Sequence, residues 1–247
     1  MIIQQFVETI KIKDGKALNL SFHQSRMCRT MRHFFADAPV PALADVLSPT
    51  PDMQFYKARV LYDGQGVVDV QYAPYTMREI RSLKVVVDDR IDYSFKSADR
   101  SSLNRLTAQK GDCDEIIIVK NGLVTDTSFT NIAVFDGEQW LTPRHPLLMV
   151  TKRVSLLEKH ILKEADISVE TLMRAQKVSL INAMIDLGER EIALENVIGF
   201  RPPSNQIPFA TYRLLMSDKV ANHAPSFRSE YRLGVELYAV HIVGAVS

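Results

Sequence analysis

The chain has 247 residues, of which 46% are hydrophobic and 24% are charged, proportions that are ordinary for a globular protein. They exclude a wholly disordered chain, a collagen-like fibre and a coiled coil. The 30 Lys and Arg residues nearly balance the 29 Asp and Glu residues, and the sequence shows no strongly basic stripe of the kind that binds nucleic acid.

The first part of the chain has the pattern of strands around one helix. Residues 2–12 alternate loosely up to the turn signal Asp14-Gly15, and residues 21–35 have apolar side chains at helical spacing. A proline-rich connection with one helical turn is predicted at 39–52. Further strands are predicted at 56–62, 67–73 and 83–87, the first two joined by a hairpin. We therefore predict a small N-terminal α/β domain over residues 1–87.

The pattern changes after about residue 91. Helices are predicted over 101–109, 151–165 and 170–177, and the segment 151–165 has the clearest apolar face. Strands are predicted over 114–120, 123–125, 132–135, 178–185 and 191–197. We predict a larger, β-rich C-terminal domain with helices over residues 88–199, and an α+β fold class for the two parts together.

Residues 200–247 differ from the rest, because they contain four prolines and no long periodic segment before residue 231. We predict an appended tail of unknown role. A tail that completes a partner's sheet stays open as the alternative.

Neither end of the sequence shows a targeting signal. The N-terminus has no basic region followed by a long apolar run, and no stretch approaches the roughly 18 apolar residues that a membrane span needs. Two cysteines, Cys28 and Cys113, cannot form a disulfide framework. We therefore expect a cytoplasmic protein with neither a membrane nor a nucleic-acid partner.

Common site motifs are missing from the sequence. It has no Gly-rich phosphate loop, no His-Glu-x-x-His, no cysteine spacing suited to zinc and no nucleophile elbow. The six histidines are scattered. No metal site is therefore predicted.

A lysine at position 96 is the first residue that suggests chemistry. In the segment 93–97, an extended chain would place Tyr93 and Phe95 on one side and Lys96 on the other. Burying an ammonium group is costly, so a buried lysine is best explained by a lowered pKa, and such a lysine can form a Schiff base with an aldehyde cofactor. An exposed strand lysine is the alternative.

An acidic residue follows thirty positions later. Asp126 comes after a predicted strand and before a run of small polar residues. A carboxylate placed there can hold the protonated ring nitrogen of a pyridine cofactor. Taken alone, Asp126 also fits an ordinary turn.

These residues belong to an ordered series of motifs. The series is Phe-Val-Glu-Thr-Ile at 6–10, Phe-His-Gln-Ser-Arg-Met at 22–27, Lys96, Asn-Gly-Leu-Val-Thr-Asp at 121–126 with Asn131-Ile132, Leu-Thr-Pro at 141–143, the segment 147–153, and Leu-Ile-Asn-Ala-Met at 180–184. It resembles the class IV aminotransferase family, the fold-type IV pyridoxal-phosphate enzymes, over residues 1–199. That family includes branched-chain and D-amino-acid aminotransferases and aminodeoxychorismate lyase.

The resemblance implies a two-part, D-amino-acid-aminotransferase-like fold that binds pyridoxal 5'-phosphate. It implies that Lys96 forms the Schiff base and moves the proton, that Asp126 pairs with the ring nitrogen, and that Arg26 binds the phosphate. Four further cofactor-binding residues are implied, two at a helix N-terminus and two in a later loop: Val150, Thr151, Asn182 and Ala183. The resemblance also implies a homodimer that acts on a small amino acid or keto acid.

Three positions depart from the family pattern. Asp126 stands where the family usually has Glu, Met149 replaces the glycine before the phosphate-binding pair, and the segment 99–101 lacks the tyrosine often found about five residues after the lysine. These departures indicate a divergent branch of the family.

We predict an aminotransferase acting on a small amino acid, with aminodeoxychorismate lyase as the alternative. The Asn-Ala-Met segment at 182–184 favours the lyase. A non-catalytic relative that kept the fold is a third reading, motivated by Met149 and the missing tyrosine. Four side chains of the segment 72–81 are candidates to reach a substrate carboxylate, unless that segment is only a polar loop: Tyr72, Tyr75, Arg78 and Arg81.

Overall fold

The computed structural model describes residues 4–199, 231–233 and 236–238. The chain divides into two units, residues 1–200 and 201–247. In the second unit, the short strands β14 (Tyr231–Leu233) and β15 (Glu236–Tyr238) form an antiparallel pair. The rest of the predicted tail lies outside the described residues.

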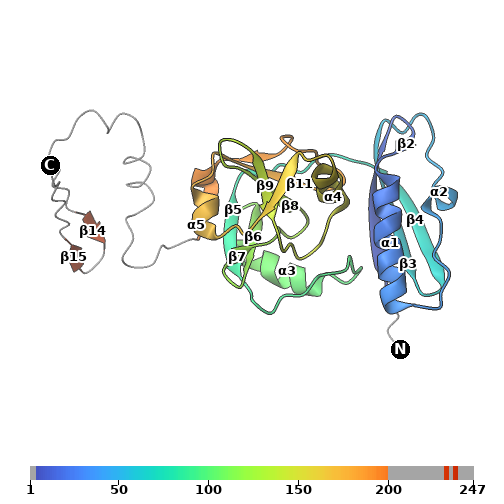
Figure 1. Ribbon diagram of the computed structural model, residues 1–247, viewed down its shortest axis with the longest axis horizontal. Coiled ribbons are helices and arrows are strands. Elements are labelled where there is room, and N and C mark those ends of the chain that lie inside the picture. Colours follow the sequence, from blue (N-terminus) through green and yellow to red (C-terminus); the bar gives the residue numbers. More distant parts are fainter. Residues whose placement is uncertain (1–3, 200–230, 234–235, 239–247) are drawn as a thin grey trace. The chain divides into compact units, whose positions relative to one another are not determined.

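The first half of the larger unit is an antiparallel sheet with one long helix (Figure 1). Its four strands lie in the order β2-β1-β3-β4. Their bounds are β1 (Phe6–Lys13), β2 (Lys16–Ala17), β3 (Phe55–Asp63) and β4 (Gly66–Pro74). Asp14 and Gly15 both have positive φ values in the β1–β2 turn, as the turn signal predicts.

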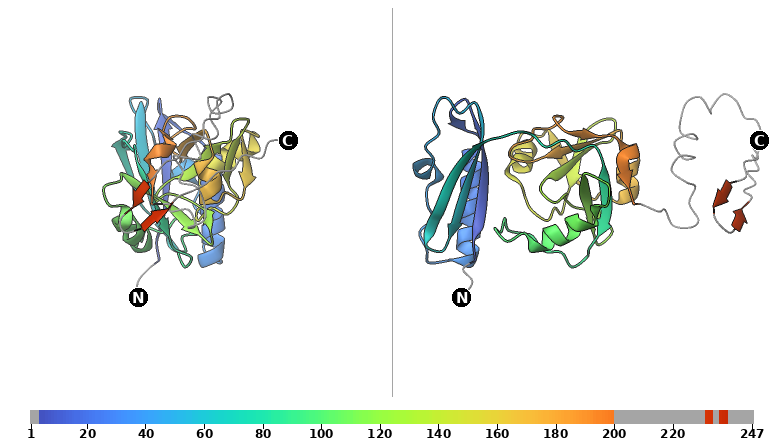
Figure 2. Two further views of the ribbon diagram at one scale, coloured as in Figure 1. Left: turned by 90° about the vertical axis from the view of Figure 1, so that its left-hand side faces the viewer. Right: turned by 180° about the vertical axis from the view of Figure 1, so that it is seen from behind.

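Helix α1 (Leu20–Phe34) packs on one face of this sheet (Figure 2). Met27 and Met31 of α1 are fully buried against Ile10 and Val60 of the sheet. The single helical turn α2 (Leu43–Val46) lies within the proline-rich connection. The elements predicted for this half are therefore confirmed, except that the strand predicted at 83–87 pairs with β6 in the second half.

The second half begins with a mixed sheet in the order β13-β5-β6-β7. Strands β5 (Leu83–Val87) and β6 (Glu115–Lys120) are parallel, because α3 (Ser101–Thr107) and a 3₁₀ turn (Ala108–Lys110) lie in the crossover between them. The edge strands are β7 (Leu123–Val124) and β13 (Val197–Ile198). Leu103 and Leu106 of α3 pack on Ile116 and Ile118 of β6.

A third sheet has the order β10-β9-β8-β11-β12. Its strands are β8 (Asn131–Phe135), β9 (Trp140–Pro143), β10 (Leu162–Ala165), β11 (Lys177–Ile181) and β12 (Glu191–Ile192). Helices α4 (Thr151–Glu158) and α5 (Val169–Met173) lie in its connections. Strands β9 and β10 are parallel, and the other neighbours are antiparallel.

Four predictions in this half are wrong in their extent. The helix predicted over 170–177 ends at Met173, and the strand predicted over 178–185 ends at Ile181. The helix predicted over 151–165 ends at Glu158, because His160 adopts a left-handed backbone (φ 56°) and the chain then pairs as β10 with β9. The strand predicted over 191–197 is split by a 3₁₀ turn, Leu194–Asn196, so that β12 and β13 belong to different sheets.

None of the helices in the described part of the chain is long and apolar enough to cross a lipid bilayer.

Candidate active site

Lys96 lies in the loop between β5 and α3, which returns from the second half to the start of β1 in the first half. Its carbonyl accepts the Val7 N–H at 3.0 Å, and the Ala98 N–H reaches the Gln5 carbonyl at 2.8 Å. The segment around Lys96 is therefore held along the start of β1.

Two aromatic side chains that precede Lys96 in the chain enter different cores. Phe95 stacks on His33 of α1, with ring centroids 4.6 Å apart, whereas Tyr93 is buried in the core around α3 and β6. The prediction that Tyr93 and Phe95 share one side is wrong, because the segment is not a strand but a crossing between two cores.

The Lys96 amine has no hydrogen-bond partner among the described residues. Burial, together with the nearby Arg26 and Arg100 cations, lowers the pKa of Lys96 to about 7 against the opposing effect of Glu8. At neutral pH a much larger share of this amine is therefore neutral than in an ordinary lysine.

Lys96 borders two hollows. The larger pocket has a volume of about 300 Å³, and no Asp or Glu is found among the described residues that line it. Its lining includes five cationic side chains: Arg26, Lys57, Arg59, Lys96 and Arg100. The smaller hollow, of about 20 Å³, brings Lys96 together with Asp126. The larger pocket is therefore suited to an anionic ligand.

Asp126 is held by two donors. Its Oδ2 accepts the Leu148 N–H at 2.8 Å, and its Oδ1 accepts the Asn131 side-chain amide at 2.6 Å. Burial raises the pKa of the carboxyl to about 7, although both hydrogen bonds oppose the shift. Sequence reasoning placed Asn131 in a motif but did not foresee that it holds Asp126.

Arg26 is paired with a buried acid. Its Nε donates to Glu8 Oε1 at 2.8 Å and its Nη2 to Glu8 Oε2 at 2.5 Å. His23 Nδ1 lies 2.6 Å from the same Oε2. Burial favours the neutral acid, but Arg26 and His23 outweigh it and lower the pKa of Glu8 to about 2. Arg26 still lines the larger pocket.

The two residues predicted at a helix N-terminus both line the larger pocket, but they differ in what they offer a ligand. The Val150 N–H is engaged, since it donates to Asn131 Oδ1 at 3.2 Å. The Thr151 hydroxyl lies 3.3 Å from His23 Nε2. Because Thr151 is the first residue of α4, its N–H has no acceptor within the helix.

Asn182 and Ala183 also line the larger pocket. The Asn182 Oδ1 accepts the N–H groups of Met184 and Ile185, at 2.8 and 3.0 Å, and its amide donates to the Phe129 carbonyl. Asn182 thus shapes a turn at the pocket wall, and Ala183 presents only a methyl group there.

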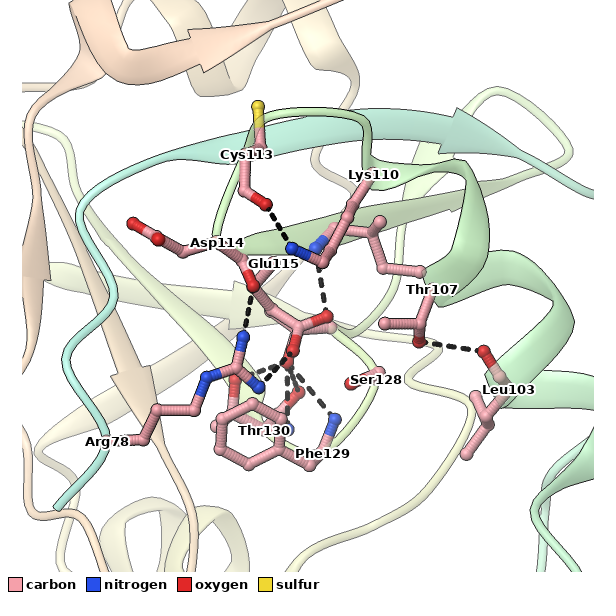
Figure 3. A network of polar contacts seen from close by, with 12 residues as sticks. Arg78, Leu103, Thr107, Lys110, Cys113, Asp114, Glu115, Ser128, Phe129 and Thr130 are labelled. Atoms are coloured by element: carbon pink, nitrogen blue, oxygen red, sulfur yellow. Dashed lines mark hydrogen bonds and ion pairs between the residues drawn. The ribbon is translucent and has the colours of Figure 1, made fainter.

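Of the four candidates between residues 72 and 81, only Tyr75 lines the larger pocket. The Tyr72 hydroxyl accepts the Ser48 N–H, and Arg81 pairs with Glu79 at the surface. Arg78 lies over the Phe129 ring at 5.7 Å and faces the buried Glu115 (Figure 3). These three side chains therefore have structural partners.

Sequence reasoning missed Lys57, Arg59 and Arg100. Lys57 and Arg59 lie two positions apart on β3, so the period-two alternation of a strand puts both on one face. That signal is present in the sequence, but nothing there shows that this face meets Lys96.

The model of the family "Amino-transferase class IV" matches residues 5–189, which is most of the chain. The chain belongs to this family. It is a pyridoxal-phosphate-dependent enzyme, and the fold class expected from the resemblance is confirmed.

Two relatives from Haemophilus have more than a third of their residues in common with the chain. An uncharacterized protein of Haemophilus influenzae is 37% identical over 181 residues, which cover 72% of this chain and 96% of the relative. A structure from Haemophilus somnus, provisionally assigned as a 4-amino-4-deoxychorismate lyase, is 36% identical with a TM-score of 0.70, covering 76% of this chain and 100% of that one.

A more distant structure shows the same fold. The branched-chain aminotransferase of Thermoproteus uzoniensis is 18% identical, with a TM-score of 0.64, and 88% of each chain is covered. Class IV aminotransferase structures with bound pyridoxal phosphate are also among the neighbours.

The residues around Lys96 fit this cofactor. An amine without a partner can condense with its aldehyde, a cation-lined pocket suits its phosphate, and a buried carboxylate adjoins the same lysine. Met149, in the glycine position, is 43% exposed, so its side chain points away from the protein interior.

Proposed function

We propose that Lys96, Arg26 and Asp126 form the cofactor site of this enzyme. The observation that supports this most is the Lys96 amine, which has no partner among the described residues and borders both hollows. When bound, pyridoxal 5'-phosphate supplies an electron sink conjugated with the amine of the substrate.

In this proposal, each residue has one task. Arg26 and the N–H of Thr151 bind the phosphate, and Asp126 holds the ring nitrogen. Val150, Asn182 and Ala183 shape the wall of the site, because the Val150 N–H and the Asn182 side chain are already engaged.

Lys96 moves the proton. A lysine with a pKa of about 7 takes up and releases a proton readily at neutral pH. The Arg26 and Arg100 cations hold its pKa down, so the amine is regenerated in its neutral form after each transfer.

For the reaction, we propose cleavage of 4-amino-4-deoxychorismate to 4-aminobenzoate and pyruvate. That substrate has two carboxylates, which match Lys57 and Arg59, two cations in the pocket wall that have no partner in the described part of the chain. The cleavage breaks the bond from the ring to the enolpyruvyl oxygen, removes one ring proton and returns one proton to the methylene carbon. Lys96 is the group placed to move that proton. The 36% identity to the Haemophilus somnus protein supports the same choice.

Transamination of a small amino acid is the second candidate, which the sequence alone favoured. The same lysine serves it, since transamination also shifts one proton near the cofactor. We also propose, from the family resemblance, a homodimer in the cytoplasm.

Substitution of Lys96 tests the site. The Lys96→Ala variant is expected to lose the absorbance band that pyridoxal 5'-phosphate gives on reconstitution, because no condensation partner remains. Lys84→Ala is the control, since Lys84 lies on β5 and lines neither hollow. If Lys96→Ala keeps the absorbance band as fully as Lys84→Ala does, the proposed site is contradicted.

Product analysis separates the two reactions. Wild-type protein is incubated with aminodeoxychorismate, or with single amino acids and a keto acid. Release of 4-aminobenzoate and pyruvate supports the lyase, and keto-acid formation from an amino acid supports the aminotransferase. A protein that forms no band with the cofactor would instead be the non-catalytic relative.

A further inference from the structure

We propose that Glu8 and His23 are positioning residues that hold the two phosphate-binding arms of the pocket, Arg26 from the first half and Thr151 from the second. The proposal rests on the proposed cofactor site and adds to it the residues behind its phosphate end.

Glu8 fixes the orientation of Arg26. It lies on β1 with none of its surface exposed, and its two oxygens accept Arg26 Nε and Nη2. This two-point contact fixes the plane of the guanidinium. The remaining nitrogen, Nη1, has no hydrogen-bond partner among the described residues, and Arg26 lines the larger pocket. A phosphate there would meet a donor that is already oriented.

His23 links the same carboxylate to the other arm. It is fully buried on α1, with Nδ1 2.6 Å from Glu8 Oε2 and Nε2 3.3 Å from the Thr151 hydroxyl. An ionised Glu8 has no proton to give, so Nδ1 carries the proton of the ring. Burial lowers the pKa of His23, which keeps the ring neutral and leaves Nε2 to accept from the Thr151 hydroxyl.

This assignment divides the tasks of Thr151. Its hydroxyl proton points to His23, so its N–H remains for an anion at the first turn of α4. One buried carboxylate therefore sets the geometry of two donors that come from separate helices, α1 and α4. Neither Glu8 nor His23 lines the larger pocket, so each acts through another residue.

The test compares two ligands that differ only in the phosphate. Dissociation constants of the apoprotein are measured by absorbance for pyridoxal 5'-phosphate and for pyridoxal, which has the same aldehyde and ring. Glu8→Gln and His23→Gln are each expected to weaken binding of the phosphate form by about tenfold or more and to leave pyridoxal within about twofold.

The matched control is Glu115→Gln. Glu115 is also fully buried and also faces one arginine, Arg78, but it lines neither hollow (Figure 3). It is expected to change neither constant. Circular dichroism shows whether Glu8→Gln and His23→Gln fold. If either variant does not fold, Thr151→Val is used in its place, because the Thr151→Val substitution removes only the contact with His23.

The outcomes are distinct. An unchanged ratio of the two constants, whether both ligands weaken equally or neither does, overturns the positioning role. Failure of the wild-type protein itself to bind either ligand overturns the proposed cofactor site instead.

Discussion

At the scale of single residues, the pKa of Lys96 is lowered by its burial and by the neighbouring Arg26 and Arg100 cations. The order of motifs predicts Lys96, Asp126 and Arg26 as site residues, because each lies in a short local pattern, and in the structure each of them lines at least one of the two hollows. The contacts of Glu8 with His23 and Arg26 were not predictable. They join β1 to α1, and only the packed fold brings those elements together.

Arg100 offers a test of this dependence. Its cation lowers the pKa of Lys96, so Arg100→Ala should raise that pKa and shift the reactivity of the amine to higher pH. The measurement is competitive acetylation of Lys96 in the apoprotein across about pH 6 to 9, with mass spectrometry. Arg105→Ala, an exposed arginine of α3 that pairs with Asp88, should leave the profile in place. A shift of the Arg100→Ala profile to lower pH would contradict the explanation that the Arg100 cation lowers the pKa of Lys96.

At the scale of elements, the clearest difference between sequence and structure is α4. Apolar residues at 154, 156, 157, 161 and 162 fit a helix through 165, so the pattern alone cannot reveal where it ends. An apolar residue at 162 suits a buried position in a helix as well as in a strand, and Leu162 is buried in the structure. The backbone pairing of β10 with β9 decides that this segment is a strand. Such pairing depends on a strand twenty residues earlier and leaves no local signal.

The end of α4 can be probed at His160. This exposed residue has a φ of 56°, a conformation that glycine adopts at lower cost than other residues. His160→Gly is expected to raise the free energy of unfolding by up to about 1 kcal/mol, measured by urea denaturation. Lys159→Gly, at a neighbouring exposed position with φ −82°, should lower it instead. Equal effects of the two substitutions would contradict a strained left-handed residue.

At the scale of the whole molecule, the fold class followed from the motif order, and the family match confirms it. The domain boundary near residue 88 stays a prediction. The relatives from Haemophilus are nearly fully covered by this chain, while about a quarter of this chain lies outside them. A role for residues 200–247 could not be derived from the sequence, because no motif there resembles the family.

The two halves of the larger unit are joined by an ion-pair cluster. Asp186, in the loop after β11, accepts Lys11 of β1 at 2.8 Å and also contacts Lys152 of α4. The Lys11 side chain is 7% exposed, so Asp186→Asn would leave a buried cation without its partner. Because Asp186 itself is partly exposed, we expect a loss of about 1–3 kcal/mol in the free energy of unfolding, measured in urea.

Asp166→Asn provides the comparison. Asp166 pairs with Arg144, and both side chains are about half exposed. Removing this pair should cost less than about 1 kcal/mol. A loss at Asp186 no larger than that at Asp166 would show that the cluster does not hold the halves together.

The crossing of the chain at Lys96 has a consequence for how this enzyme tolerates change. Two aromatic residues just before Lys96 anchor this loop, Phe95 against one hydrophobic core and Tyr93 in the other, and they thereby position the proposed reactive nitrogen. A core mutation far from the pocket that lets either ring drift will displace that nitrogen, even when the protein remains folded. Such mutations should therefore lower the turnover rate before they lower the melting temperature. Selection for a high melting temperature alone does not select for activity.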